Sequence, residues 1–133
     1  MNAVLEHVNL TVTDADAFAG LLGRLFGWHE RWRGPIEGGR AVHVGTRTSY
    51  IALFQFDAPL ERAPAQYSRT GAMNHMAFTV DDLDAMEARV RAEGLPVSRP
   101  AAYEPGRRFY TFLPDDIEVE IVSYAPVLAD TAA

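Results

Sequence analysis

The sequence predicts an α+β fold of two βαβββ modules, related by a pseudo-twofold, whose strands form a curved mixed sheet around a cleft. An internal repeat and the same order of strand-like and helix-like segments in both halves of the chain support this prediction. The length of 133 residues is enough to bury an apolar core without disulfide bonds. We expect a single domain over 1–133, with module 1 at about 4–56, a linker at about 57–71 and module 2 at about 72–124.

The repeat relates residues 5–18 to residues 73–86 at an offset of 68. Six of the fourteen aligned positions are identical, and the first of these pairs is His7 with His75. A repeat of this kind marks one structural unit that is built twice. Because a pseudo-twofold brings equivalent residues together near its axis, we expect His7 and His75 to lie close to each other.

Each module is expected to begin with a strand. Residues 4–12 alternate, so that Val8 and Leu10 share one face and His7 shares the other with Asn9. Further β-type segments are indicated by apolar and aromatic residues between turn signals. In module 1 these segments are 28–34, 39–46 and 48–56, and in module 2 they are 96–103, 107–113 and 117–124.

A helix is expected after the first strand of each module. Asp14 is a good N-cap, an apolar stripe at helical spacing follows it, and Gly27 ends the helix. In the second module Asp81 or Asp82 is the N-cap and Gly94 ends the helix. Both helices then cover one face of their strands and leave the other face open.

The chemistry is expected on that open face. The apolar residues of each first strand pack under the helix, which turns His7 and His75 away from it. In 117–124 the same alternation places Glu118 and Glu120 opposite the apolar Val119. Two neutral imidazoles and one carboxylate can hold a divalent metal and leave positions open for a substrate. A histidine in a strand is more often a packed or surface residue, and the repeat is what favours the metal site.

Composition excludes several classes of function. The net charge is −6, all twelve bases are arginine and there is no cysteine, so thiolate chemistry is absent and nucleic acid is a poor partner. No apolar run reaches the roughly 18 residues that a membrane span needs, and the first residues do not resemble a signal peptide. We expect a cytoplasmic protein that forms a homodimer, binds a small-molecule substrate, and has neither a nucleic-acid nor a membrane partner.

Three segments carry a family resemblance: EHVNLTVTD, NHMAFTVDD and RRFYTFLPDDIEVEIV. Together they resemble the vicinal oxygen chelate superfamily, which includes glyoxalase I, extradiol dioxygenases and the fosfomycin- and bleomycin-resistance proteins. The resemblance covers residues 4 to 124. Its best motif is an aromatic strand, an Asp-Pro-Asp-Gly-Asn turn and a strand carrying glutamate. The turn is altered here, since Leu113 replaces its first Asp and Asp116-Ile117 replace Gly-Asn.

This resemblance implies a metal centre of His7, His75 and Glu120, in which Glu118 is not a ligand. The metal would be Fe(II), Mn(II), Zn(II) or Ni(II). Glyoxalase I and the related epimerases use a fourth ligand or base in the middle of the fourth strand, where this chain has Ala52, and Gln55 lies on the opposite face. Extradiol enzymes have an additional histidine beside their metal ligands, and it would fall near residues 101–103, which are Ala-Ala-Tyr.

The predicted function is therefore that of a metal-dependent enzyme that binds two vicinal oxygens of a small substrate and resembles the dioxygenases more than glyoxalase I. Tyr110 and His43 are the candidate catalytic residues, and Tyr110 matches a tyrosine that extradiol enzymes place near substrate. The candidate substrate pocket is formed by Tyr50, Ala52, Phe54 and Phe56. Two alternatives are a metal-free ligand-binding protein of the bleomycin-resistance type and a glyoxalase-type lyase.

Overall fold

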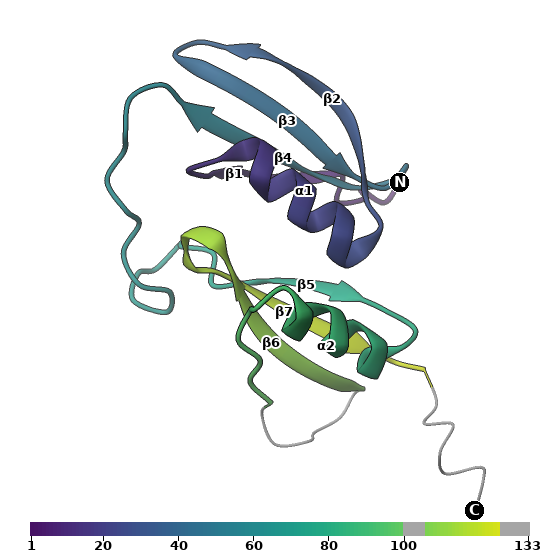
Figure 1. The fold of residues 1–133 in the computed structure, drawn as a ribbon. Helices are drawn as coiled ribbons and strands as arrows, with labels where there is room; N and C mark the ends of the chain where they lie inside the picture. Colours follow the sequence, from purple (N-terminus) through teal and green to yellow (C-terminus); the bar gives the residue numbers. More distant parts are fainter. Residues whose placement is uncertain (100–105, 126–133) are drawn as a thin grey trace, which may run out of the picture. The chain divides into compact units, whose positions relative to one another are not determined.

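The first half of the chain forms a four-stranded sheet with one helix across it (Figure 1). The structure is a computed structural model that describes residues 1–99 and 106–125, and its contacts divide the chain into two units, Met1–Ala63 and Pro64–Ala133. The sheet of unit 1 has the order β1-β4-β3-β2, with β1 parallel to β4 and the other pairs antiparallel. Its elements are β1 (His7–Thr11), α1 (Ala15–Phe26), β2 (His29–Ile36), β3 (Gly39–Gly45) and β4 (Tyr50–Phe56).

Helix α1 begins and ends where its sequence predicts. The Asp14 side chain accepts a hydrogen bond from the Ala17 amide at 3.0 Å, and Gly27 ends the helix in the left-handed conformation that glycine adopts without strain. Phe18 and other apolar residues of the helix are buried against β3 and β4. Each such fully buried side chain contributes about 1.5–3 kcal/mol, so this face holds the helix on the sheet.

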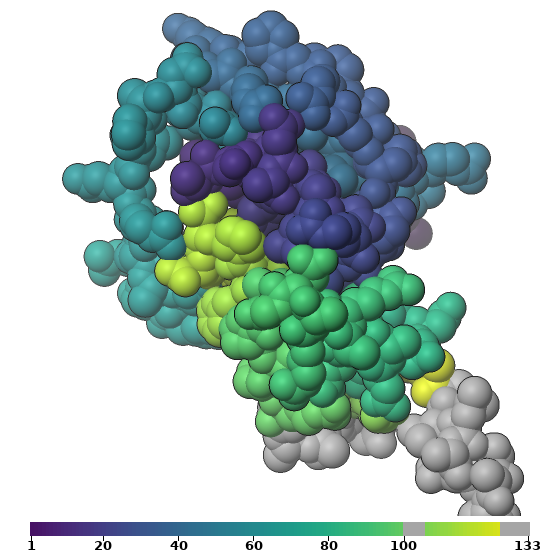
Figure 2. All heavy atoms as spheres, viewed as in Figure 1, coloured from purple at the N-terminus to yellow at the C-terminus, as the bar shows by residue number. Residues whose placement is uncertain are grey.

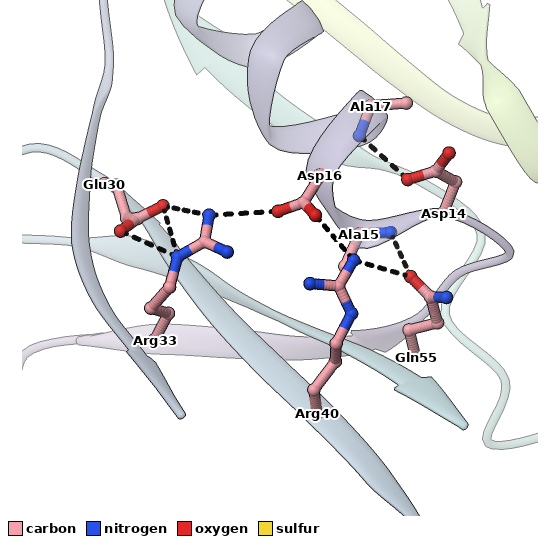
Figure 3. A network of polar contacts seen from close by, with 8 residues as sticks. All are labelled: Asp14, Ala15, Asp16, Ala17, Glu30, Arg33, Arg40 and Gln55. Atoms are coloured by element: carbon pink, nitrogen blue, oxygen red, sulfur yellow. Dashed lines mark hydrogen bonds and ion pairs between the residues drawn. The ribbon is translucent and has the colours of Figure 1, made fainter. Parts of the chain in front are cut away.

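Polar contacts tie the start of α1 to the sheet (Figure 3). The Asp16 carboxylate accepts hydrogen bonds from Arg40 at 2.6 Å and from Arg33 at 2.9 Å, and these two guanidinium groups lower the pKa of Asp16. The Gln55 side-chain oxygen accepts a hydrogen bond from the Ala15 amide at 2.9 Å. Gln55 therefore points toward α1, on the face of β4 opposite to Ala52, as the strand alternation predicts.

Unit 2 repeats this plan with a three-stranded sheet of order β5-β7-β6, in which β5 is parallel to β7 and β6 is antiparallel to it. Asp82 is the N-cap of its helix, and Figure 2 shows the green atoms of this helix and its flanking residues in front of the strands. The buried apolar residues under the helix include Val90, Phe109 and Val119. The elements of unit 2 are β5 (Met76–Thr79), α2 (Leu83–Ala92), β6 (Arg107–Leu113), the 3₁₀ turn η1 (Pro114–Asp116) and β7 (Ile117–Ser123).

The α+β class and the two-module plan are confirmed, and the predicted starts of two strands are wrong. The first strand begins at His7 rather than at residue 4, because its parallel partner β4 begins at Tyr50, opposite His7, and Val4 is 85% exposed. Strand β2 begins after Trp28, and a bulge between Glu30 and Trp32 shifts its register against β3. In 96–99 only Ser98 pairs with β6, as an isolated bridge; the rest of the predicted strand 96–103 lies outside the described residues.

The turn between β6 and β7 has a left-handed backbone. Asp115 and Asp116 have φ values of 65° and 58°. Aspartate tolerates this conformation better than most residues, because its short polar side chain can bond locally. Asp116 can therefore take the place of the glycine in the Asp-Pro-Asp-Gly-Asn turn of the motif. The Gln66 side chain donates a hydrogen bond to the Asp116 carbonyl, which attaches the segment before β5 to this turn.

Candidate functional site

A buried carboxylate, Glu120, lies at the centre of the candidate site in unit 2. Glu120 is only 7% exposed and stands on β7 directly opposite Tyr110 of β6. The Tyr110 hydroxyl donates a hydrogen bond to Glu120 Oε1 at 2.7 Å, and Arg108 Nη1 donates to the same oxygen at 3.1 Å. A buried carboxylate requires such partners, because its charge loses the solvation of water. Both contacts use Oε1 and leave Oε2 to face His75.

His75 lies directly before β5, and each of its two ring nitrogens faces different groups. Its Nε2 is 3.9 Å from Glu120 Oε2. Its Nδ1 is 3.1 Å from the Tyr67 hydroxyl, which itself donates a hydrogen bond to Glu118 Oε2 at 2.8 Å. A carboxylate only accepts, so the single hydroxyl proton of Tyr67 is directed to Glu118. The Tyr67 oxygen must therefore accept from Nδ1–H, and neutral His75 then carries its lone pair on Nε2.

The pair formed by His75 Nε2 and Glu120 Oε2 fits a divalent cation. Nitrogen and oxygen ligands lie about 2.0–2.2 Å from a zinc-sized ion, which places two ligand atoms of one ion about 3–4 Å apart. The two acceptor atoms are within that range at 3.9 Å, and Nδ1 has the hydrogen-bond acceptor that metal-binding histidines commonly use. Within 1–99 and 106–125, however, no group of three or more His, Asp or Glu residues could hold a metal ion by itself.

An open hollow of about 370 Å³ lies next to this pair in unit 2. Its size is at the lower end of the range for small-molecule sites. Tyr67 has a raised pKa, first because its hydroxyl donates to Glu118 and second because of burial, so it stays protonated. The residues that line the hollow are Tyr67, Ser98, Arg99, Tyr110 and Glu118, and Arg99 also pairs with Glu87.

In unit 1 the equivalent histidine, His7, is held in a similar way. Its Nδ1 is 2.9 Å from Glu6 Oε1, and since the carboxylate only accepts, Nδ1 donates, which leaves the lone pair of the neutral ring on Nε2. The hydrogen bond from His7 also lowers the pKa of Glu6. The ring of His7 stacks on Tyr50 at a centroid distance of 4.8 Å, which fixes its orientation. Both repeat-equivalent histidines thus engage Nδ1 and present Nε2.

The other predicted residues of unit 1 share the face of the sheet opposite to α1. His43 lies opposite Ala52 in the register of β3 and β4, stacks on Tyr50 at 4.8 Å and is 5.0 Å from the ring of Trp32. Burial, followed by the charges of His7 and Arg31, lowers the pKa of His43. Phe54 and Phe56 contact each other edge to face, at 6.1 Å. The roles of His43 and Tyr110 in catalysis, and of Tyr50, Ala52, Phe54 and Phe56 in a pocket, stay predictions.

The sequence analysis assigned no role to three residues that contact the proposed ligands or their partners. Arg108 could have been found, because it alternates with Tyr110 on β6 and so shares the face of Glu120. Glu118 was placed on the correct face but was not assigned a role. Tyr67 falls in the segment 57–71, which has no periodicity, and no pattern in the sequence indicates that its hydroxyl reaches His75. The alanines and tyrosine at 101–103, where the resemblance would need a histidine, lie outside the described residues.

The model of the Glyoxalase/Bleomycin resistance protein/Dioxygenase superfamily matches residues 4–121. The chain therefore belongs to this superfamily, as the repeat and the motif of β6 and β7 indicate. A search of curated proteins gave no match. In the part of the chain that the structure describes, no helix is long and apolar enough to cross a membrane.

Solved structures share the fold at low sequence identity. A genomically encoded fosfomycin resistance protein, FosX from Listeria monocytogenes, is 23% identical over 98% of both chains, with a TM-score of 0.71. A glyoxylase/bleomycin resistance protein/dioxygenase domain from Frankia sp. EAN1pec is 21% identical over 92% of this chain and 98% of its own, with a TM-score of 0.75. Another FosX structure from Listeria monocytogenes contains Mn(II) and a sulfate ion; it is 22% identical over 100% of both chains, with a TM-score of 0.68.

Proposed function

We propose that this protein is a metal-dependent enzyme that binds a small substrate through two neighbouring oxygens at a centre of His7, His75 and Glu120. The observation that carries the proposal is the pair of His75 Nε2 and Glu120 Oε2. In the neutral form of His75 inferred above both atoms are acceptors, and they face each other at 3.9 Å. Two facing acceptors repel each other unless a cation or a proton lies between them.

The third ligand of the proposal is His7. It is the repeat equivalent of His75, and its Nδ1 is engaged by Glu6 in the way that the Nδ1 of His75 is engaged by Tyr67. In this proposal the Nε2 lone pair of His7 is the one that binds the metal. The equivalence supports one metal bound by both histidines, and the loss of either ring is expected to weaken it.

A divalent metal at this centre would act as a Lewis acid that stabilises an anionic oxygen of the substrate. Residues of the chain do the remaining work in the proposal. Arg108 and Tyr110 hold the Glu120 carboxylate in place, and Tyr110 also faces the hollow in which a substrate would lie. Three protein ligands leave room for a bidentate substrate and one further small ligand, so dioxygenase-like chemistry fits better than glyoxalase I chemistry. Ala52 supports this preference, since alanine cannot serve as a fourth ligand or base.

Titration of the metal-free protein with Mn(II), the metal found in a FosX structure, tests the proposal. We expect one bound metal per chain, and a loss of binding of at least about tenfold in His7→Ala, His75→Ala and Glu120→Gln. His29→Ala is the matched control, because His29 is an exposed histidine of β2 outside the site. Binding that is unchanged in His75→Ala would contradict the metal site.

A panel of catechols, α-keto aldehydes and epoxides, with fosfomycin among them, then separates the reaction classes. Turnover of a catechol supports the dioxygenase-like preference, and turnover of an α-keto aldehyde supports the lyase. Tight binding of an aromatic ligand without metal and without turnover would instead support the ligand-binding alternative.

We further propose a cytoplasmic homodimer, because twofold pairs are the commonest oligomers and a chain without cysteine fits a reducing compartment. Light scattering measures the oligomeric state.

A further inference from the structure

The hydroxyl of Tyr67 lies between a ring nitrogen of His75 and the carboxylate of Glu118. Its oxygen is 3.1 Å from His75 Nδ1 and 2.8 Å from Glu118 Oε2, whereas Nδ1 and Glu118 Oε2 are 4.0 Å apart. The direct distance is too long for a hydrogen bond. Glu118 therefore acts on His75 through the Tyr67 hydroxyl. The direction of these hydrogen bonds is fixed by the Glu118 carboxylate, which can only accept.

We propose that Tyr67 and Glu118 are positioning residues that select the tautomer of His75 and so present the Nε2 lone pair to the metal; this inference rests on the function proposed above. Glu118 accepts the hydroxyl proton of Tyr67, and the Tyr67 oxygen then accepts Nδ1–H. Neither residue is a metal ligand in this proposal. An acceptor on the second ring nitrogen of a ligating histidine commonly improves metal affinity.

The backbone around Tyr67 is shaped for this contact. Tyr67 has a φ of 66°, a left-handed conformation that a bulky residue rarely adopts. Its amide donates a hydrogen bond to Asn74 Oδ1 at 2.8 Å, next to His75 in the sequence. Strained backbone of this kind persists where the surroundings hold it, and such positions gather at functional sites. One residue before the histidine, Asn74 thus holds the loop that brings the hydroxyl to His75.

Glu6 and Asn74 occupy equivalent positions in the repeat, at the offset of 68. In unit 1 Glu6 accepts from His7 Nδ1 directly, at 2.9 Å. In unit 2 the effect of Asn74 on the His75 ring is indirect. Asn74 binds the Tyr67 amide, and the Tyr67 hydroxyl oxygen accepts from His75 Nδ1. Two different sets of residues therefore produce the same result, an imidazole with Nδ1 as the donor. This convergence is the second, independent observation for the proposal.

The tautomer can be measured directly from the nitrogen NMR shifts of the His75 ring. The measurement is made on metal-free protein at a pH where the nitrogen shifts of the ring are those of a neutral imidazole. We expect Nδ1–H in the wild-type protein. In Glu118→Ala the Tyr67 hydroxyl loses its acceptor and can donate to Nδ1, so the ring is expected to shift toward Nε2–H. In Glu118→Gln the amide oxygen still accepts, and the Nδ1–H form is expected to remain.

Two further variants test whether the tyrosine transmits the effect. Adding Tyr67→Phe to Glu118→Ala removes the hydroxyl that donates to Nδ1, and part of the Nδ1–H population is expected to return. Tyr124→Phe removes an exposed phenol elsewhere in unit 2 and is the matched control. In Mn(II) titrations, Glu118→Ala is expected to weaken binding about tenfold and Glu118→Gln to weaken it less.

A Glu118→Ala protein that keeps the wild-type nitrogen shifts would overturn the positioning role, whatever its metal affinity. Failure of the proposed function has a different signature: wild-type protein and His75→Ala would then take up Mn(II) equally. Because the tautomer is measured without metal, that second outcome leaves the result for Tyr67 and Glu118 standing. Circular dichroism of each variant confirms that it is folded before its ring is measured.

Discussion

Tyr110 and Glu120 lie directly opposite each other on β6 and β7, and the tyrosine hydroxyl donates to Glu120 Oε1 at 2.7 Å. The contact is part of the sheet itself, since residues in register on neighbouring antiparallel strands project on the same face. It keeps one carboxylate oxygen occupied and turns the other toward His75. The same phenol lines the hollow beside the site. Tyr110 therefore positions the carboxylate, and in the function proposed above it would also contact a substrate.

Tyr110→Phe is expected to weaken Mn(II) binding about tenfold, because removal of a partner of a ligating carboxylate typically has an effect of this size. The fold is expected to persist, since the phenyl ring keeps the packing of the tyrosine. Isothermal titration calorimetry measures the affinity, and Tyr124→Phe, at a residue 61% exposed, is the control. Equal affinity in Tyr110→Phe and wild-type protein would show that this hydrogen bond does not position the carboxylate.

The elements with strong periodicity were predictable from the sequence. The alternation of β7 placed Glu120 on the open face, and the aspartate caps placed the starts of both helices, because these signals depend only on near neighbours in the chain. The family resemblance then selected Glu120 rather than Glu118 as the ligand. The contacts around Glu120 support this choice, since its second oxygen faces His75 Nε2.

Features that depend on tertiary neighbours were not predictable. Val4 continues the alternation of the first strand, but no partner strand reaches it and it stays exposed. The bulge after Glu30 changes which side chains share a face with Trp32, and no residue there signals it. Tyr67 approaches His75 only because its backbone is left-handed and Asn74 binds its amide. Such contacts arise from the path of the loop, which local propensities do not determine.

The stability of unit 1 is expected to fall as the pH is lowered through the histidine range. Burial lowers the pKa of His43 from its ordinary value of 6.5, and the charges of His7 and Arg31 lower it further, whereas Glu6 acts in the opposite direction. The unfolded chain then binds a proton at a pH where the folded chain does not, so the free energy of unfolding rises with pH below about 6.5 and levels off above it.

Urea titration followed by tryptophan fluorescence measures this effect, because both tryptophans lie in unit 1. His43→Gln is expected to reduce the slope of stability against pH between the folded and unfolded pKa values. His29→Gln, at an exposed position of β2, serves as the control. A slope that His43→Gln leaves intact would assign the pH dependence to other groups.

Thr111→Val is expected to stabilise unit 2 by about 1 kcal/mol. Thr111 of β6 is 1% exposed, and among the described residues its hydroxyl oxygen has no hydrogen-bond partner. Valine has nearly the same shape, removes the buried hydroxyl and retains a high preference for strands. Thermal unfolding followed by circular dichroism measures the change. Thr79→Val, at an exposed position of β5, is the control and is expected to stay within about 0.5 kcal/mol.

Arg108→Met is expected to destabilise the metal-free protein by about 2–4 kcal/mol, because it leaves the buried Glu120 carboxylate without its cation. Arg107→Met on the same strand is the matched control; it removes the exposed pair with Asp84, which contributes about 0–1 kcal/mol. Saturating Mn(II) should then restore much of the stability lost in Arg108→Met, since a metal at Glu120 replaces the missing charge. Binding to the folded state alone raises the free energy of unfolding by about 2.7 kcal/mol at a hundredfold excess over Kd. Equal losses in both variants would show that the carboxylate is not the charge that Arg108 balances, and no restoration by Mn(II) would contradict a metal at Glu120.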